Sequence, residues 1–353
     1  MGLTKQKKGR KRYIALLFLT MLLSLAGTSL AAQAGTASGG GVVAVASRHR
    51  VSNGKWVKTS KGLRYKKKSG AYIKNSWCMI NKSVYYFDKK GYVETGSFTY
   101  GGHHYYADAK GRLSINKLVK IGSKTYYYGS KGSRIWGMWK TINGKTYYFD
   151  RLGAMVKNSW VGNRYVGKDG ALVKNRTIQG RRINSQGVAQ SLAKNDKYIV
   201  VGASRIEDMS VAVSSSKTIF IARSGKGYQW LKSTGYPQLK KYLEQNGNCK
   251  VIFNLGNNDT EDINLYIQLY RKIIKEYPKT KFYFLDVLPG AKSAADKNAA
   301  RRAFNKKMKA AFGSRCIGGY DYLMQTGFSL VDKTHYTTDT SKKIYRYIMN
   351  KVA

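Results

Sequence analysis

The sequence is poor in the residues that define several structural classes. Only three of its 353 residues are proline, which excludes a polyproline or collagen-like chain. Only three are cysteine, so a disulfide-dense scaffold is excluded and CxxC redox or metal pairs are absent. A disulfide between Cys249 and Cys316 is left open. Because 42% of the residues are hydrophobic and 13% are aromatic, the chain is not wholly disordered, and its length predicts about two domains.

Acidic residues are also scarce, and their distribution divides the chain. The 64 Lys and Arg residues outnumber 18 Asp and Glu, which gives a formal net charge of +46. Residues 35–190 hold 30 basic and 5 acidic residues, whereas residues 191–353 hold 28 and 13. The first region is therefore predicted to attract polyanions. Nucleic acid is not the predicted partner, because no helix-turn-helix or zinc pattern accompanies the charge.

The N-terminus has the features of an export signal. A cluster of basic residues precedes an apolar run at positions 13–26, and Ala32-Gln33-Ala34 offers a small-x-small cleavage site. The run is shorter than the roughly 20 residues of a membrane-spanning helix. Residues 1–34 are predicted to be a signal peptide, with an uncleaved anchor as the alternative, and no permanent membrane span is predicted after cleavage. The Gly/Ala/Ser-rich start of residues 35–53 predicts a linker.

Residues 54–190 contain internal repeats. The best copies, such as SVYYFDKKG, join a tyrosine pair to an Asp-x-x-Gly segment. Tyr-Tyr-Phe favours a strand and Asp-x-x-Gly favours a turn, so each unit is predicted to be a short hairpin. A lone hairpin is barely stable in water, so the hairpins are expected to stack as a β-solenoid. The glycines recur at a nearly constant interval and then more closely at the end: Gly70, Gly91, Gly111, Gly132, Gly153, Gly170 and Gly187.

The aromatic residues of these repeats are the candidate ligand-binding surface. Their faces can stack on sugar rings or attract a quaternary ammonium group, whereas the alternative role, favoured for most of the tyrosines, is hairpin core. The candidate ligand-binding residues are Trp77, Tyr85, Tyr86, Tyr105, Tyr106, Tyr126, Tyr127, Trp139, Tyr147, Tyr148 and Trp160.

This pattern resembles the cell-wall-binding repeats of Gram-positive surface proteins, of the choline-binding and glucan-binding type. The resemblance implies a secreted, extracellular protein attached to a cell-wall polymer, either teichoic acid or glycan. In the choline-binding version a Trp usually precedes the tyrosine pair, and this departure weighs against choline as the ligand. The corresponding residues here are Val84, His104, Thr125 and Thr146.

Residues 191–353 alternate predicted strands with predicted helices. Helical spacing of apolar residues predicts a helix over residues 262–277 and a final helix from about residue 340, capped by Asp339 or Thr340. Such alternation predicts a parallel sheet covered on both faces, with the active site at the carboxyl ends of the strands. Short apolar runs place the strands at residues 197–203, 217–222, 250–255 and 281–288.

Three polar segments lie at or near those ends. Ser204 follows the first strand, Asn257-Asn258-Asp259 follows the third, and Asp332 and His335 precede the last helix. A serine needs a base to become a nucleophile, and imidazole is the usual one. Asp332 is suited to fix the tautomer of His335, so the three residues are predicted to form a catalytic triad. The predicted oxyanion-hole donors are the backbone N–H of Ser204, that of Gly225 or Gly227, and the side chain of Asn258.

These segments resemble the SGNH (GDSL-type) hydrolases over residues 196–353. The four markers of that family correspond to Ser204, a glycine of the SGKGY segment with Gly227 preferred, Asn258 of the G-x-N-D pattern, and His335 of D-x-x-H. The family usually has Asp before the serine, and Ala203 takes that place here. The resemblance implies a multidomain protein in which a flavodoxin-like, three-layer α/β domain follows the repeats.

The same resemblance implies a wall-attached serine esterase that removes O-acetyl or other short acyl groups from glycans. A glycan O-acetyltransferase uses the same triad and stays open. A non-catalytic adhesion protein is the second alternative, because Ala203 replaces the family Asp. No cofactor is implied. No metal is predicted, because adjacent His103 and His104 point to opposite faces of a strand.

Overall fold

The computed structural model describes residues 42–192, 196–213, 215, 217–245 and 248–353. The predicted signal peptide at residues 1–34 lies outside this range. Part of the predicted linker is helical instead, because residues Val42–Arg48 form helix α1. Val42 and Ala46 are buried in one cluster with Trp77 of the repeats. The linker prediction is therefore wrong for residues 42–48. Val42 and Ala46 are four positions apart, so they lie on one side of the helix and form an apolar face that packs against the repeats.

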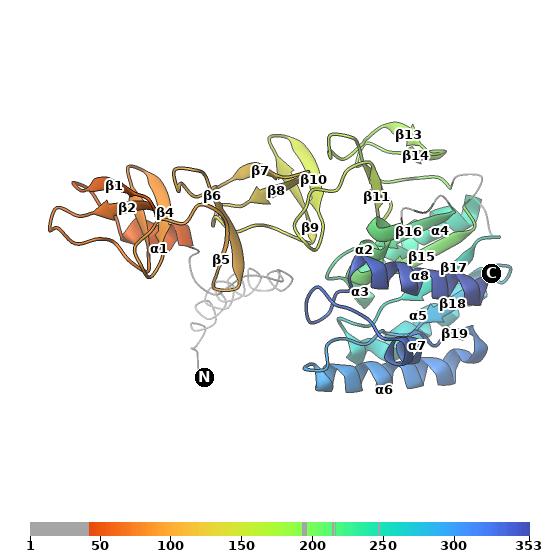
Figure 1. Cartoon of the computed structure of the whole chain (residues 1–353). Helices are drawn as coiled ribbons and strands as arrows, with labels where there is room; N and C mark the ends of the chain where they lie inside the picture. Colours follow the sequence, from red (N-terminus) through yellow and green to blue (C-terminus); the bar gives the residue numbers. More distant parts are fainter. Residues whose placement is uncertain (1–41, 193–195, 214, 216, 246–247) are drawn as a thin grey trace, which may run out of the picture. The chain divides into compact units, whose positions relative to one another are not determined.

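Seven antiparallel hairpins follow α1 in the described chain (Figure 1). In each of the first six hairpins, a Trp, Phe or Leu of the first strand lies directly opposite a tyrosine of the second strand, as Trp77 does opposite Tyr86. The hairpin prediction is confirmed. The pairs are β1 (Lys55–Thr59) with β2 (Gly62–Lys66), β3 (Ser76–Ile80) with β4 (Ser83–Phe87), β5 (Gly96–Tyr100) with β6 (His103–Ala107), β7 (Lys117–Ile121) with β8 (Lys124–Tyr128), β9 (Met138–Ile142) with β10 (Lys145–Phe149), β11 (Ser159–Val161) with β12 (Arg164–Val166), and β13 (Arg176–Ile178) with β14 (Arg181–Ile183).

The Asp-x-x-Gly segments form turns that follow the hairpins. The Asp150 carboxylate accepts the backbone N–H groups of Leu152 and Ala154 at 2.9 and 2.8 Å. Gly153 has φ of +79°, a left-handed conformation that glycine adopts without strain. These turns direct the chain back towards the preceding hairpin.

Backbone hydrogen bonds then join each hairpin to the one before it. After several of the turn glycines, the backbone N–H two residues later donates to the carbonyl that precedes the tyrosine pair of the preceding hairpin. Contacts between neighbouring repeats are what hold a solenoid together. Examples are Leu113 to Val84 at 2.9 Å, Arg134 to His104 at 2.9 Å, Met155 to Thr125 at 2.8 Å and Leu172 to Thr146 at 2.7 Å.

The C-terminal part is an α/β domain with a five-stranded parallel sheet in the order β16-β15-β17-β18-β19. All four predicted strands are confirmed, and the fifth escaped prediction because it has only two residues. The strands are β15 (Tyr198–Gly202), β16 (Thr218–Ala222), β17 (Lys250–Asn254), β18 (Phe282–Leu285) and β19 (Cys316–Ile317).

Helices cover both faces of this sheet. Helices α2, α7 and α8 pack on the face that presents Val200, and α4, α5 and α6 pack on the face that presents Val201. The final helix is capped by the Thr337 hydroxyl, which accepts the N–H of Thr340, so the predicted caps were wrong. The helices are α2 (Ser204–Val213), α3 (Tyr228–Trp230), α4 (Tyr236–Gln245), α5 (Ile263–Glu276), α6 (Ala295–Phe312), α7 (Gly319–Thr326) and α8 (Thr338–Val352).

The last hairpins share a core with the α/β domain. Trp160 of β11 and Ile183 of β14 belong to the same buried cluster as Val201. The guanidinium of Arg181 in β14 pairs with the Asp196 carboxylate, and the two side chains are 2% and 0% exposed. The predicted boundary between residues 190 and 191 therefore falls inside one continuous core.

The three cysteines all have free thiols, so Cys249 and Cys316 are not bridged in this structure. Burial raises the pKa of Cys78 to about 12 and that of Cys249 to about 11. Among the residues that the structure describes, we find no helix with the length and apolar character required to cross a bilayer. The same residues contain no group of three or more His, Cys, Asp or Glu side chains arranged to hold a metal ion.

Candidate active site

Ser204 lies at the first position of helix α2, directly after strand β15. The turn between them is tight, because a Cβ on Gly202 would lie 2.2 Å from the Ile206 side chain and 2.8 Å from the carbonyl of Asn254. The first N–H groups of a helix have no acceptor within the helix, and its N-terminal end favours negative charge. This position therefore suits both a nucleophile and an N–H donor to a developing oxyanion.

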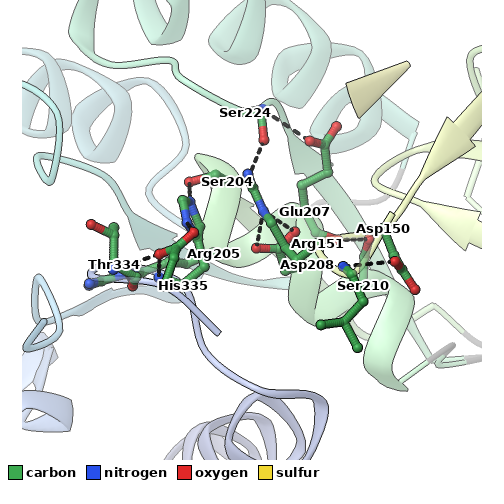
Figure 2. Close-up of polar contacts among 12 residues, drawn as sticks. Asp150, Arg151, Ser204, Arg205, Glu207, Asp208, Ser210, Ser224, Thr334 and His335 are labelled. Carbon is green, nitrogen blue, oxygen red and sulfur yellow. Dashed lines mark hydrogen bonds and ion pairs between the residues drawn. The ribbon is translucent and has the colours of Figure 1, made fainter. Parts of the chain in front are cut away.

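The structure brings the three predicted triad residues together. Figure 2 labels two of them, Ser204 and His335. The Oγ of Ser204 lies 2.9 Å from Nε2 of His335, although 131 positions separate the two residues. Nδ1 of His335 lies 2.8 Å from Oδ2 of Asp332. The side chain of His335 is 12% exposed. With Nδ1 donating to the carboxylate, Nε2 faces the serine as an acceptor for its proton.

Asp332 is held in its ionised form. Burial raises the pKa of this carboxyl group, but the hydrogen bond and charge of His335 outweigh the effect and hold the pKa well below its usual range. The backbone N–H groups of Thr334 and His335 also donate to Oδ1, each at 2.7 Å. A carboxylate that stays ionised can stabilise the imidazolium that forms when the serine proton is transferred.

The predicted oxyanion donors lie on the loops that flank Ser204. Strand β15 lies between β16 and β17, so the segments after those strands are its neighbours at the carboxyl edge. The side-chain amide of Asn258 donates to the carbonyl of Lys226 at 2.9 Å. A Cβ on Gly227 would lie 2.0 Å from Oδ2 of Asp259. Gly227 therefore packs against the Asn258–Asp259 segment, whereas Gly225 lies in an exposed left-handed turn with φ of +70°.

Arg205 is a buried residue beside the candidate site that sequence reasoning missed. It follows the candidate nucleophile directly and is 5% exposed. Its guanidinium donates to the carbonyls of Leu288, Pro289 and Thr334 at 2.6, 3.0 and 3.0 Å. Burial lowers the pKa of Arg205 to about 10. Because Thr334 precedes His335, these bonds tie the serine segment to the histidine segment, and nothing in the sequence distinguishes this arginine from a surface one.

A second buried arginine supports the loop after β17. Arg301 of α6 is 2% exposed and donates through Nε to the side-chain oxygen of Asn257 at 3.0 Å. Its Nη1 donates to the side chain of Asn298 at 2.6 Å. The loop that carries Asn258 is therefore fixed by a helix that begins only after strand β18, much later in the chain.

The candidate aromatic residues of the repeats divide into two groups. Six are buried and serve as core, which corrects their assignment as ligand-binding residues: Trp77, Tyr85, Tyr105, Tyr127, Tyr148 and Trp160. The other five are partly exposed: Tyr86, Tyr106, Tyr126, Trp139 and Tyr147. This burial does not follow the simple alternation of a pleated strand, because neighbouring residues such as Tyr127 and Tyr128 are both buried.

Two of the partly exposed rings are faced by arginines of the chain itself. The guanidinium of Arg134 lies 5.1 Å from the ring centre of Tyr126, and that of Arg164 lies 5.7 Å from Trp139. A more open aromatic surface occurs earlier, where Tyr86 lies 4.9 Å from Tyr100 between ring centres and Tyr100 is 41% exposed. Sequence reasoning missed Tyr100, which lies outside the tyrosine pairs.

Comparison with known proteins identifies the repeats. Two family models described as choline-binding repeats match residues 115–160 and 154–188. Residues 115–188 thus contain choline-binding repeats. A search of curated proteins finds no match.

Solved structures with similarity to this chain include three pneumococcal proteins. Choline binding protein F from Streptococcus pneumoniae is 28% identical with a TM-score of 0.34, and the match covers 38% of this chain and 46% of that one. This chain therefore spans less than half of the length of choline binding protein F. The autolysin LytC from the same organism is 20% identical with a TM-score of 0.35, covering 84% and 69%. A putative platelet activating factor from Streptococcus pneumonia is 14% identical with a TM-score of 0.37, covering 45% and 84%.

Proposed function

We propose that this protein is a secreted, cell-wall-attached serine esterase of the SGNH type, a carboxylic ester hydrolase that removes O-acetyl or other short acyl groups from glycans. The observation that carries the proposal is the hydrogen-bonded series from Ser204 through His335 to Asp332. The nucleophile is within hydrogen-bond distance of the base, and the base is within hydrogen-bond distance of the orienting carboxylate, as this chemistry requires.

In the proposed reaction Oγ of Ser204 attacks the ester carbonyl carbon while its proton passes to Nε2 of His335. The oxyanion of the tetrahedral intermediate is stabilised by the N–H of Ser204, the N–H of Gly227 and the amide of Asn258. The intermediate breaks its bond to the glycan oxygen, which takes the proton from His335. Water then attacks the acyl carbon while His335 takes its proton. The second tetrahedral intermediate breaks its bond to Oγ of Ser204, which takes this proton from His335, and the carboxylic acid is released. Ala203 takes no part in these steps, since its side chain lies in the hydrophobic core.

The repeats are proposed to hold this enzyme on a cell-wall polymer. The choline-binding repeats at residues 115–188 support attachment to the wall. The 30 basic and 5 acidic residues of positions 35–190 favour an anionic polymer such as teichoic acid. The open rings of Tyr86 and Tyr100 are the best placed to stack on a sugar or face an ammonium group.

The decisive test uses the full chain with Ser204→Ala and, as matched control, Ser293→Ala, which changes an exposed serine. We expect Ser204→Ala to lower hydrolysis of acetylated sugars by about 10⁴-fold or more, and the control to keep wild-type turnover. Wild-type turnover by Ser204→Ala would overturn the proposal. Added glycan acceptors that trap the acyl group in place of water would identify a transferase. Failure of a fluorophosphonate to label Ser204 would favour a non-catalytic adhesion protein.

A further inference from the structure

One residue of the repeats reaches the candidate active site. Arg151 lies in the Asp-x-x-Gly turn that follows β10, and its Nε lies 3.1 and 3.0 Å from the two carboxylate oxygens of Asp208 in helix α2 (Figure 2). The two side chains are 9% and 10% exposed. Asp208 is one helical turn after Ser204, so the pair is attached to the helix that presents the candidate nucleophile.

The same guanidinium also holds the neighbouring loop. Nη2 of Arg151 donates to the hydroxyl of Ser224 at 2.8 Å. The backbone N–H of Ser224 donates to the carboxylate of Glu207 in α2 at 3.1 Å. Ser224 begins the SGKGY segment that carries Gly227. Arg151 therefore joins the nucleophile helix to the segment with the candidate oxyanion donors.

A second hairpin contacts the same helix independently. The backbone N–H of Gly162, in the loop between β11 and β12, donates to the hydroxyl of Ser210 in α2 at 2.7 Å. A Cβ on Gly162 would lie 3.2 Å from the carbonyl of Ala222 at the end of β16. One side of α2 is therefore covered by the repeats.

The other repeats provide an internal comparison. Arg151 lies two positions before the turn glycine, Gly153. Only at this turn does the side chain in that position enter the α/β domain, so the contact is a property of this one hairpin and not of the repeat. The residues at the same position of the other turns are all exposed: Lys68, Lys89, Ala109, Ser130, Lys168 and Ser185.

We infer that Arg151 is a positioning residue of the proposed esterase, and that the hairpin β9–β10 is part of the catalytic unit as well as of the wall-binding array. This inference rests on the proposed function. Arg151 acts through Asp208 and Ser224 by keeping the start of α2 and the SGKGY segment in register. Misplacement of reacting groups by about 1 Å lowers rates by about 10²-fold.

The experiment uses the full chain with Arg151→Met, Arg151→Lys and Ser224→Ala, and with Lys168→Met as the matched control in the next turn. Turnover of p-nitrophenyl acetate is expressed per active site titrated with a fluorophosphonate, so unfolded protein does not contribute. Hydrogen exchange is measured for residues 204–213 and 223–228, a readout that needs no catalysis.

We expect Arg151→Met to lower kcat by about 10- to 100-fold with little change in KM, and to speed exchange in both segments. Arg151→Lys keeps the charge and should restore part of kcat, but loses the bidentate geometry. Ser224→Ala keeps the ion pair between Arg151 and Asp208. This variant should therefore fold, and it should lower kcat less than Arg151→Met does. Lys168→Met should match the wild type in both readouts.

Two results would overturn the inference: unchanged exchange in both segments of Arg151→Met, or unchanged kcat per titrated site in both Arg151→Met and Ser224→Ala. An inactive wild-type protein would overturn the proposed function instead. In that case faster exchange in Arg151→Met alone would still support the tie between the hairpin and α2.

Discussion

An early and a late hairpin of the array bury their aromatic residues against different partners. Trp77 of β3 packs against Phe98 and Tyr105 of the next hairpin, with ring centres 5.9 and 5.2 Å apart. Trp160 of β11 occupies the equivalent position, but it lies in the core of the α/β domain and faces the guanidinium of Arg181 at 4.9 Å. One repeat pattern thus builds a separate core among the hairpins in one region and joins the core of the α/β domain in the other.

The largest expected effect comes from cutting the chain between these two regions. A chain that begins at Gly137 keeps hairpins β9 to β14, so we expect it to fold and to retain esterase activity. A chain that begins at Ser191 lacks Trp160, Ile183 and Arg181, and we expect it to lose cooperative unfolding and activity. Circular dichroism melts and ester hydrolysis would check both. Full activity in the shorter chain would contradict the shared core.

The next effect compares two ion pairs. Arg181→Met leaves the buried carboxylate of Asp196 without its guanidinium, and we expect a loss of about 3–5 kcal/mol in the free energy of unfolding. Arg112→Met removes the exposed pair with Asp108 in an early turn, where the arginine is 52% exposed. There we expect less than about 1 kcal/mol. Urea denaturation measures both, and equal losses would contradict the comparison.

A smaller effect concerns pH. Burial raises the pKa of Asp286 in the α/β domain to about 6. In the folded protein Asp286 holds its proton more tightly than in the unfolded chain. The stabilisation that this proton provides is fully present below about pH 4 and is lost as the pH rises through about 6. Asp286→Asn should therefore gain stability relative to wild type, by up to about 3 kcal/mol, between pH 4 and pH 7.

Asp108, in a turn of the repeats, should change the dependence of stability on pH in the opposite direction. Burial raises the pKa of Asp108, but hydrogen bonds from the backbone and side chain of Arg112 and from Lys110 outweigh it and lower the pKa. Asp108→Asn should therefore cost stability at neutral pH, and this cost should disappear on acidification. Urea denaturation at several pH values would check both trends, and parallel trends would argue against this account.

The smallest expected effect concerns the open aromatic surface. Tyr100→Ala should weaken binding to purified cell walls by up to about tenfold, because the ring is 41% exposed. It should also cost about 1 kcal/mol of stability, since the ring contacts Trp77 and Tyr86. Binding should also fall between 0.1 and 1 M NaCl, since the Debye length shortens from about 10 to about 3 Å. A sedimentation assay measures both changes in binding, and salt-independent binding would contradict the electrostatic part.

Much of the fold was predictable because its signals are local. The hairpins follow from the regular recurrence of a tyrosine pair and a turn glycine, and the buried strands follow from short apolar runs. The pairing of Asp332 with His335 follows from their closeness in the D-x-x-H segment. Burial within the hairpins was less accessible, since Tyr85 and Tyr86 look alike in the sequence although only Tyr85 is buried.

The amino-acid sequence by itself determined the repeat period, the parallel sheet and the identity of the candidate triad, because each is encoded by residues close together or by segments with a recognisable order. Only the tertiary structure decided that Arg151 and Arg205 support Ser204. Their partners lie 57 to 129 positions away, and several are backbone carbonyls, which carry no residue type to recognise. A buried arginine is distinguished from a solvated one by what surrounds it after folding, and not by its own place in the chain.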